Sequence, residues 1–176
     1  MIPTQVEAST RDKVIIPKKE STEAYKAFSW SDYYPDKWKT QIESRKGFAG
    51  FNFWAFLFGY RWCMFRRMNR LGLIIFIIEN VIMLSAIIAA NEFRVDEKII
   101  WIFGLGAHLV LMIMVGLFGN YAYFKFAQTH IKRISTSMIS EDSFGEAVRN
   151  AGGVSLLAVF VLMGINIFIY AVIGTI

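Results

Sequence analysis

Four polar side chains lie near the middle of long apolar stretches, and they are the residues best able to support chemistry. Each stretch is about 20 residues long, and a helix of that length crosses the ~30 Å hydrocarbon layer of a bilayer. A carboxylate, imidazole or amide at that depth is costly, so it must be neutral, be paired with another polar group, or belong to a functional site. The residues are Glu79 and Asn80 in Leu71–Ala90, His108 in Ile99–Phe118, and Asn166 in Val154–Ile176.

The first two stretches predict antiparallel helices joined by the eight-residue loop Asn91–Lys98. This arrangement brings Glu79 and His108 to a similar depth, and we therefore expect a hydrogen bond between them across the two helices. With Asn80 and Asn166 they form a predicted midplane polar cluster, which indicates a proton-linked or ligand-binding site. The alternative is that these polar bonds only hold the helices together, each contributing ~0.6–2 kcal/mol.

The sequence contains no recognisable catalytic or metal-binding motif. There is no His-Glu-x-x-His, no Cys-x-x-Cys and no phosphate-binding Gly-x-x-x-x-Gly-Lys-[Ser/Thr]. Cys63 is the only cysteine, so no internal disulfide and no cysteine pair for a metal is available. Ser155 begins its apolar stretch while His108 lies in mid-span, a difference of roughly 15 Å in depth that excludes a Ser–His pair. We predict a non-enzymatic protein with no metal and no cofactor.

The composition is typical of an all-α integral membrane protein. Of its 176 residues, 55% are hydrophobic, and the mean hydropathy is +0.42. Basic residues flank the start of the first span and the end of the second, which predicts a cytoplasmic N-terminus and a C-terminus on the opposite, periplasmic side. This bias accounts for the formal charge of +5, so we expect no nucleic-acid partner.

An aromatic segment precedes the first span. Nine of the 18 residues in Phe48–Phe65 are aromatic, and such rings favour the headgroup level of a bilayer. We expect residues 48–70 to form an interfacial or re-entrant helix; a fourth span is the alternative, and it would carry the basic N-terminal region across the membrane. The arginines expected to contact anionic lipid headgroups are Arg61, Arg66, Arg67 and Arg70.

The region before this aromatic segment is polar. Residues 1–20 are predicted to be a disordered cytoplasmic tail. In residues 21–47, aromatic side chains recur at helical spacing and predict short helices, broken at Pro35. These helices lie on the membrane surface, or alternatively pack as a small cytoplasmic cap on the helices that follow.

Residues 71–176 are predicted to form a three-helix membrane domain. The second span continues at helical spacing as far as Ile134. Ser143 and Glu146 resemble a capping box, which predicts a surface helix over Ser143–Ala151. Gly152-Gly153 then mark a break before the third span.

A set of short motifs, in order along the chain, resembles a bacterial inner-membrane family, domain-of-unknown-function family 2628. The resemblance covers roughly residues 30 to 170 and implies a small multi-span inner-membrane protein with a cytoplasmic aromatic helix and no known reaction. Tyr60-Arg61 replaces the family's usual Pro-aromatic pair, so the resemblance does not imply a kink after Gly59. The matching elements are Tyr34 through Trp38, Phe51-Asn52, Ala55-Phe56, Phe58-Gly59, Trp62, Arg66-x-Met68, Gly119-Asn120-x-x-Tyr123 and Gly152-Gly153-Val154-Ser155.

These observations together predict an accessory, regulatory or immunity-type membrane protein that binds another membrane component. Its partner is a membrane protein or a second copy of the chain, in addition to the lipid bilayer itself. The alternative function is a small transporter or a lipid- or ion-binding protein that uses the midplane polar cluster. The partner surface is expected on the aromatic helix and on the small residues of the second span, Gly104, Gly106, Gly116 and Gly119.

Overall fold

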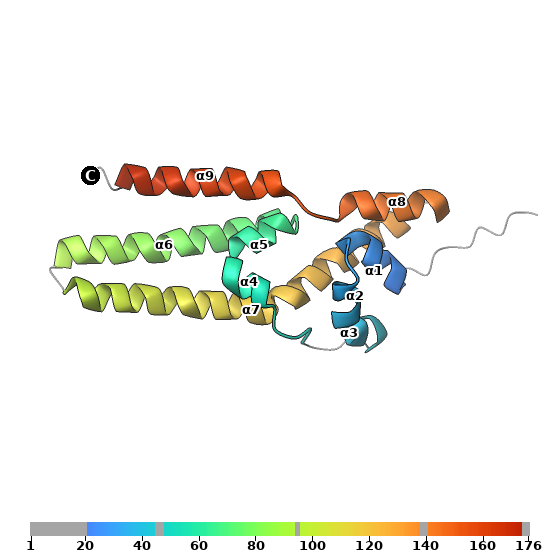
Figure 1. Ribbon diagram of the computed structural model, residues 1–176, viewed down its shortest axis with the longest axis horizontal. Coiled ribbons are helices and arrows are strands. Elements are labelled where there is room, and N and C mark those ends of the chain that lie inside the picture. The colour runs from blue at the N-terminus through green and yellow to red at the C-terminus, as the bar shows by residue number, and fades with distance from the viewer. Residues whose placement is uncertain (1–20, 45–47, 94–95, 138–140, 174–176) are drawn as a thin grey trace, which may run out of the picture.

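The computed structural model describes residues 21–44, 48–93, 96–137 and 141–173, and every regular element in them is a helix. Three helices are long and apolar enough to cross a membrane, which confirms the predicted number (Figure 1). The predicted tail, residues 1–20, lies outside the described residues. The helices are α1 (Thr22–Ser29), α2 (Tyr33–Lys37), α3 (Lys39–Ser44), α4 (Phe53–Phe58), α5 (Tyr60–Phe65), α6 (Asn69–Phe93), α7 (Glu97–Ser135), α8 (Glu141–Ala151) and α9 (Leu156–Ile173).

Helices α6 and α7 form an antiparallel hairpin (Figure 1). Helix α6 continues to Phe93 and α7 begins at Glu97, so the connection is shorter than the predicted eight residues. Asp96 caps α7, because its side chain accepts a hydrogen bond from the Lys98 N–H at 2.9 Å. Apolar length predicted both helices correctly, but it placed the turn between them imprecisely.

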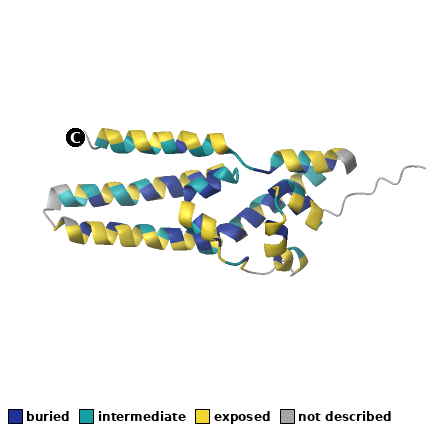
Figure 2. Ribbon diagram, viewed as in Figure 1, coloured by how far each residue is buried: buried dark blue, intermediate teal, exposed yellow. Residues whose placement is uncertain are grey.

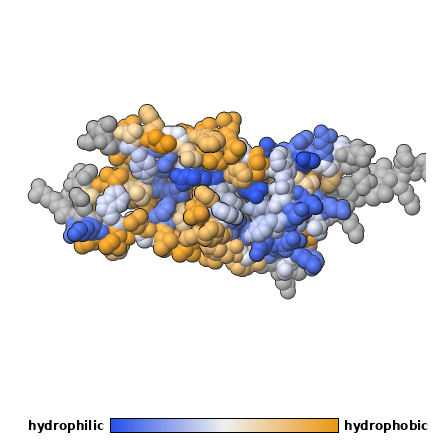
Figure 3. Space-filling model, in the orientation of Figure 1, coloured by the Kyte–Doolittle hydropathy of each residue, from blue (hydrophilic) through white to orange (hydrophobic). Residues whose placement is uncertain are grey.

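Helix α7 continues beyond the apolar region as one helix of 39 residues, as its spacing predicted. Helices α1 and α8 pack against its C-terminal half. Figure 1 shows that α7 changes direction beyond the point where α4 lies against it. Buried residues concentrate along this half and in α5 (Figure 2). The visible surface changes from mostly hydrophobic over the spans to mostly hydrophilic at the end that holds α1, α2 and α8 (Figure 3).

The three N-terminal helices form a cap packed on later helices. Tyr25, Phe28 and Trp38 are fully buried. The Tyr25 ring stacks on Phe124 of α7 at 5.4 Å between ring centroids, and Trp38 lies 5.8 Å from the same ring. Of the two arrangements predicted for this region, the packed cap is therefore the one observed.

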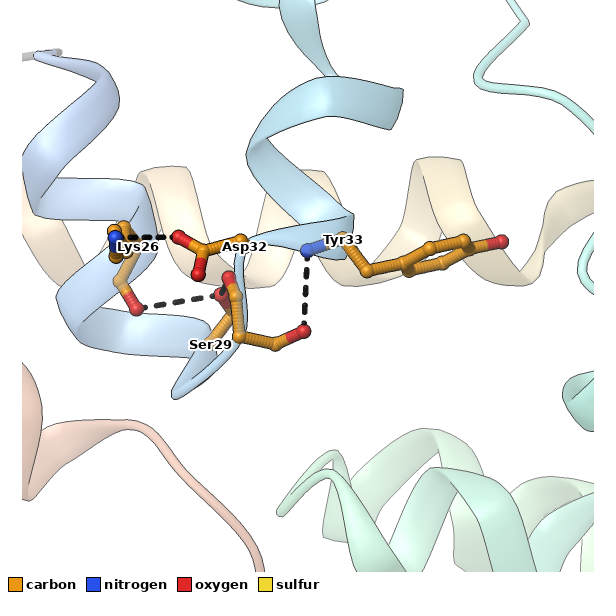
Figure 4. Close-up of polar contacts among 5 residues, drawn as sticks. Lys26, Ser29, Asp32 and Tyr33 are labelled. Carbon is orange, nitrogen blue, oxygen red and sulfur yellow. Dashed lines mark hydrogen bonds and ion pairs between the residues drawn. The ribbon is translucent and has the colours of Figure 1, made fainter.

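The break in the cap falls at Trp30 and not at Pro35. Trp30 adopts the left-handed conformation with φ 54°, which ends α1. Pro35 instead lies inside the first turn of α2, where its missing N–H has no intrahelical partner to lose. Lys26 pairs with Asp32 across this break (Figure 4), and that carboxylate raises the pKa of the Lys26 ammonium.

Helices α4 and α5 are two short helices separated by one glycine. Asn52 caps α4, since its Oδ1 accepts the Ala55 N–H at 2.9 Å. Gly59 has φ 52° and ψ −124°, a conformation that only glycine adopts readily. A break after α4 is therefore present although the proline typical of the resembled family is missing.

The turn from α5 into α6 is a Schellman motif. Arg67 takes the left-handed position with φ 60°. Its N–H donates to the Met64 carbonyl at 3.0 Å, and the Met68 N–H donates to the Cys63 carbonyl at 2.9 Å. These two bonds satisfy the last carbonyls of α5 and reverse the chain, so that α5 packs against α6.

Helix α8 begins at Glu141, two residues before the predicted start. Ser143 therefore lies within the helix, and the predicted capping box is wrong. The predicted break after Ala151 is confirmed. Gly153 fixes this break, because its φ is 81° and its N–H donates to the Phe28 carbonyl at 2.8 Å. A Cβ at Gly152 would overlap that same carbonyl, so both glycines are required where α8 meets α1.

Candidate functional site

Two asparagines from distant motifs form a buried junction between α4 and α7. Asn52 Nδ2 donates to Asn120 Oδ1 at 2.8 Å, and Asn120 Nδ2 donates to the carbonyl oxygens of Ala49 and Gly50, each at 3.2 Å. The Asn52 N–H also donates to the Gly116 carbonyl at 2.8 Å. Both side chains are buried, at 2% and 0% exposure. The amides satisfy one another and fix the entry of the chain into α4.

Glycines on α7 allow α4 to lie this close. A Cβ at Gly116 would lie 2.6 Å from the Phe51 ring, and one at Gly119 would lie 2.8 Å from Ala55 Cβ, both closer than carbon atoms approach. These two glycines are therefore covered by the chain itself and are not available to a partner, contrary to prediction. Gly106, by contrast, has open space around its Cα.

Tyr123 is the centre of an aromatic cluster next to this junction. Its ring centroid lies 4.9 Å from that of Tyr34, 5.1 Å from Trp38 and 6.0 Å from Trp62. The Arg66 guanidinium lies over the same group, 4.6 Å from the Tyr34 ring and 5.4 Å from the Tyr123 ring. The sequence marked these residues as motif positions but did not predict that they meet.

The predicted hydrogen bond between Glu79 and His108 is absent. Glu79 Oε1 and His108 Nδ1 are both buried, and neither has a hydrogen-bond partner among the described residues. A Cβ at Gly59 would lie 2.7 Å from Glu79 Oε1 and 2.9 Å from Met112 Cε, so Glu79 is level with Met112, one helical turn beyond His108. Glu79 lies 14 residues before the end of α6, whereas His108 lies 11 residues after the start of α7, so the two are offset by about one turn along the hairpin.

The Glu79 side chain lies instead beneath the junction of α4 and α5. It is 8% exposed, and its polar neighbours are the Arg61 guanidinium and the Tyr60 backbone N–H. The Arg61 guanidinium lies 4.4 Å from the centre of the Tyr60 ring, which holds this arginine close to the carboxylate. Sequence reasoning assigned Arg61 and Glu79 to separate sites, whereas the structure makes them neighbours.

The other two members of the predicted midplane cluster do meet. Asn166 Nδ2 on α9 donates to Asn80 Oδ1 on α6 at 3.2 Å, and Asn80 Nδ2 donates to the Phe76 carbonyl at 2.8 Å. The four residues are therefore not one cluster. They form an amide pair between α6 and α9, a carboxylate beneath Gly59, and a separate histidine.

Two of the four arginines predicted at the headgroup level hold parts of the protein together. Arg66 Nη1 donates to the Ser29 carbonyl at 3.1 Å, and Arg67 Nη1 donates to the Asn150 carbonyl at 2.9 Å. These bonds tie the α5–α6 turn to the cap and to α8. Arg70 is exposed on α6. Headgroup contact stays a prediction for all four.

A groove of about 680 Å³ lies between the α4–α5 pair and α9. Its walls are largely aromatic and aliphatic, and two arginines line it. The residues that define its two sides are Trp54, Phe58, Arg61 and Arg66 on one, and Leu156 and Met163 on the other.

Cys63 lies close to this groove but is closed off from solvent. Its side chain is fully buried, and burial raises the pKa of the thiol to about 12. The described residues contain no group of three or more histidine, cysteine or acidic side chains placed to hold a metal ion.

The fold and the buried junction define an all-helical protein with three helices suited to cross a membrane. Residues 19–128 match the family described as "Protein of unknown function (DUF2628)", and the chain belongs to this family. The matched region runs from the cap through most of α7, so it includes the asparagine junction and Tyr123 but not Gly152-Gly153-Val154-Ser155. No curated protein and no solved structure matches the chain.

Proposed function

We propose that this protein is a non-enzymatic accessory, regulatory or immunity-type protein of the bacterial inner membrane that binds another membrane component. The observation that carries the proposal is an exposed apolar face on α4, a helix of six residues that is too short to cross a membrane itself. Large apolar side chains exposed on such a helix leave a surface against which a partner's helix can pack.

The proposal includes a re-entrant path for α4 and α5. Going along α4, the chain contacts Gly119, then Gly116, then Met112 of α7, and it returns along α5 from Glu79 to Gly72 of α6. This order of contacts supports entry and exit at the same end of the spans. The basic residues at that end support a cytoplasmic N-terminus and a periplasmic C-terminus.

The proposed partner surface is the outer face of α4, continued by the open part of α7. Phe53, Trp54 and Leu57 are each more than half exposed on α4. Gly106 of α7 leaves space in which a second backbone can approach closely. The partner is a membrane protein or a second copy of this chain.

The test is affinity purification of the full chain in mild detergent, followed by native mass spectrometry. A second protein at fixed stoichiometry, or a defined homo-oligomer, is expected. It should be lost in Phe53→Ala with Gly106→Leu and kept in the control Phe160→Ala, which removes a similarly exposed aromatic ring from α9, outside the proposed partner surface. If the wild-type chain purifies as a monodisperse monomer with no second protein bound, the proposal is refuted.

One observation favours a second candidate, a small transporter or an ion- or ligand-binding protein. One carboxylate oxygen of Glu79 is buried without a hydrogen-bond partner, and such a group in a membrane protein typically marks an ion or ligand site. In that case Glu79→Gln abolishes transport or ligand binding in reconstituted vesicles while the protein still inserts. Under the accessory function, the same variant keeps its partner.

A further inference from the structure

We propose that the groove between the α4–α5 pair and α9 is a binding site for one anionic phospholipid. This inference does not depend on the proposed function: the groove shares Trp54 with the proposed partner surface, but it takes a lipid, and the lipid test does not require a protein partner. The groove is large enough to hold a phosphodiester headgroup with the first part of an acyl chain, at about 680 Å³. It also opens beside a helix suited to cross the membrane, so a lipid reaches it from the bilayer.

The polarity of the groove runs along the membrane normal in the order a phospholipid requires. At its shallow end, the Ser155 N–H donates to the Phe65 carbonyl at 2.8 Å, which places Arg66 beside the start of α9. Seven residues further along α9 is Met163, at a depth greater by roughly 10 Å. The deep part of the groove is walled by Phe58 and Met163, which present only apolar atoms to an acyl chain.

The charge of the groove favours an anion. Among the described residues the one ion pair within 4.0 Å joins Lys26 to Asp32, so neither arginine of the groove has a carboxylate at that distance. Arg66 lines the groove although its Nη1 is bonded to the Ser29 carbonyl of the cap. Arg61 extends the positive charge about 7 Å deeper along α5. Figure 3 shows a hydrophilic patch at the position of α5, between the hydrophobic surfaces of α9 and α4.

The acidic group that interacts with Arg61 is Glu79, which is not among the residues that line the groove. The Tyr60 ring lies 4.4 Å from the Arg61 guanidinium and packs edge-on against Phe76 of α6 at 5.1 Å. Arg61 itself lines the groove, so a phosphate bound there meets its guanidinium without meeting a carboxylate of the lining. An arginine near a membrane surface typically strengthens the binding of anionic lipid about fivefold.

The experiment uses the purified full chain, delipidated in mild detergent and mixed with phosphatidylglycerol or phosphatidylcholine, with bound lipid counted by native mass spectrometry. We expect one phosphatidylglycerol per chain to be retained in preference to phosphatidylcholine. Arg61→Gln should weaken this retention about fivefold, and Arg61→Gln with Arg66→Gln about 25-fold. The control Arg70→Gln removes an exposed arginine outside the groove and should change retention less than twofold.

A second pair of variants tests the acyl-chain part of the site without touching a charge. Val159→Trp fills the groove wall and should reduce lipid retention, whereas Val161→Trp, on an exposed face of the same helix, should not. Equal retention of the two lipids, or equal losses in Arg70→Gln and Arg61→Gln, overturns the proposal. Competition by inorganic phosphate at millimolar concentration shows a site for free anions instead. A co-purified protein that protects the cysteine of a Val159→Cys variant from maleimide labelling shows that a polypeptide fills the groove.

Discussion

Replacing Asn120 by alanine should destabilise the protein more than any other single amide deletion in the described residues. The side chain accepts a hydrogen bond from Asn52 at 2.8 Å and donates two at 3.2 Å to the carbonyls of Ala49 and Gly50. Its removal leaves Asn52 Nδ2 buried without an acceptor and takes a donor from each of two carbonyls that begin the α4 segment.

The magnitude follows from this count. A buried polar group that loses its partner costs about 1–3 kcal/mol, and a carbonyl with a second lone pair costs less than an amide donor. We expect Asn120→Ala to lower the free energy of unfolding by about 3 kcal/mol. The control Asn166→Ala removes one half-buried bond of 3.2 Å and should cost about 0.6 kcal/mol.

The assay is unfolding in mixed micelles by increasing SDS, followed by tryptophan fluorescence, with a double-mutant cycle for Asn52 and Asn120. The coupling energy should be about 1–2 kcal/mol, because the two side chains are in direct contact. Equal losses for Asn120→Ala and Asn166→Ala, or coupling below about 0.3 kcal/mol, would refute the structural role given to this junction.

Three further results follow from the hairpin formed by α4, α5 and the α5–α6 turn. Gly59→Ala should cost about 2 kcal/mol or more, because an added Cβ meets the Glu79 carboxylate at 2.7 Å and φ is 52°; Gly106→Ala, in open space, should cost little in the same SDS titration. Cys63 should react with maleimide in the folded protein far more slowly than in SDS up to pH 9, since it is buried and its pKa is about 12; fast labelling at pH 8 contradicts the burial. The free energy of unfolding should be about 1 kcal/mol lower for Arg67→Val than for Arg67→Asn, seen as unfolding at a lower SDS content, because asparagine tolerates the left-handed conformation and valine does not. Equal stability of the two variants excludes that conformation at this turn.

The sequence predicted the spans well because length and apolar content alone decide whether a helix crosses a bilayer. The same periodicity extended the second span past Asn120, and the paired glycines located the break before α9. Register was harder to predict. Each residue along a helix changes depth by ~1.5 Å, and Glu79 is three residues further from the α6–α7 turn than His108, which is enough to separate the two side chains by about one turn.

The asparagine junction could not be predicted from periodicity, because a pattern gives the buried face of a helix but not the element that covers it. Asn52 and Asn120 are 68 residues apart, and nothing in either local sequence names the other. The available signal was that both belong to motifs of the resembled family. Two buried amides in motifs of one family are good candidates for a mutual bond, since each must find a partner away from water.

This placement changes how the family motifs are interpreted. Asn52, Gly119, Asn120 and Tyr123 are covered by neighbouring side chains, and the two asparagines bond to each other, so these residues hold the α4–α5 pair against α7. The groove beside α9 shares Tyr34, Phe58, Trp62 and Arg66 with the motifs, whereas Arg61 and the α9 residues that line it lie outside them. We therefore expect variants of the buried junction, such as Asn120→Ala, to reduce the amount of folded protein, and variants such as Arg61→Gln to change binding in protein that still folds. Measuring the amount of folded protein and the amount of bound ligand separately for both kinds of variant decides whether a residue shapes the fold or contacts the ligand.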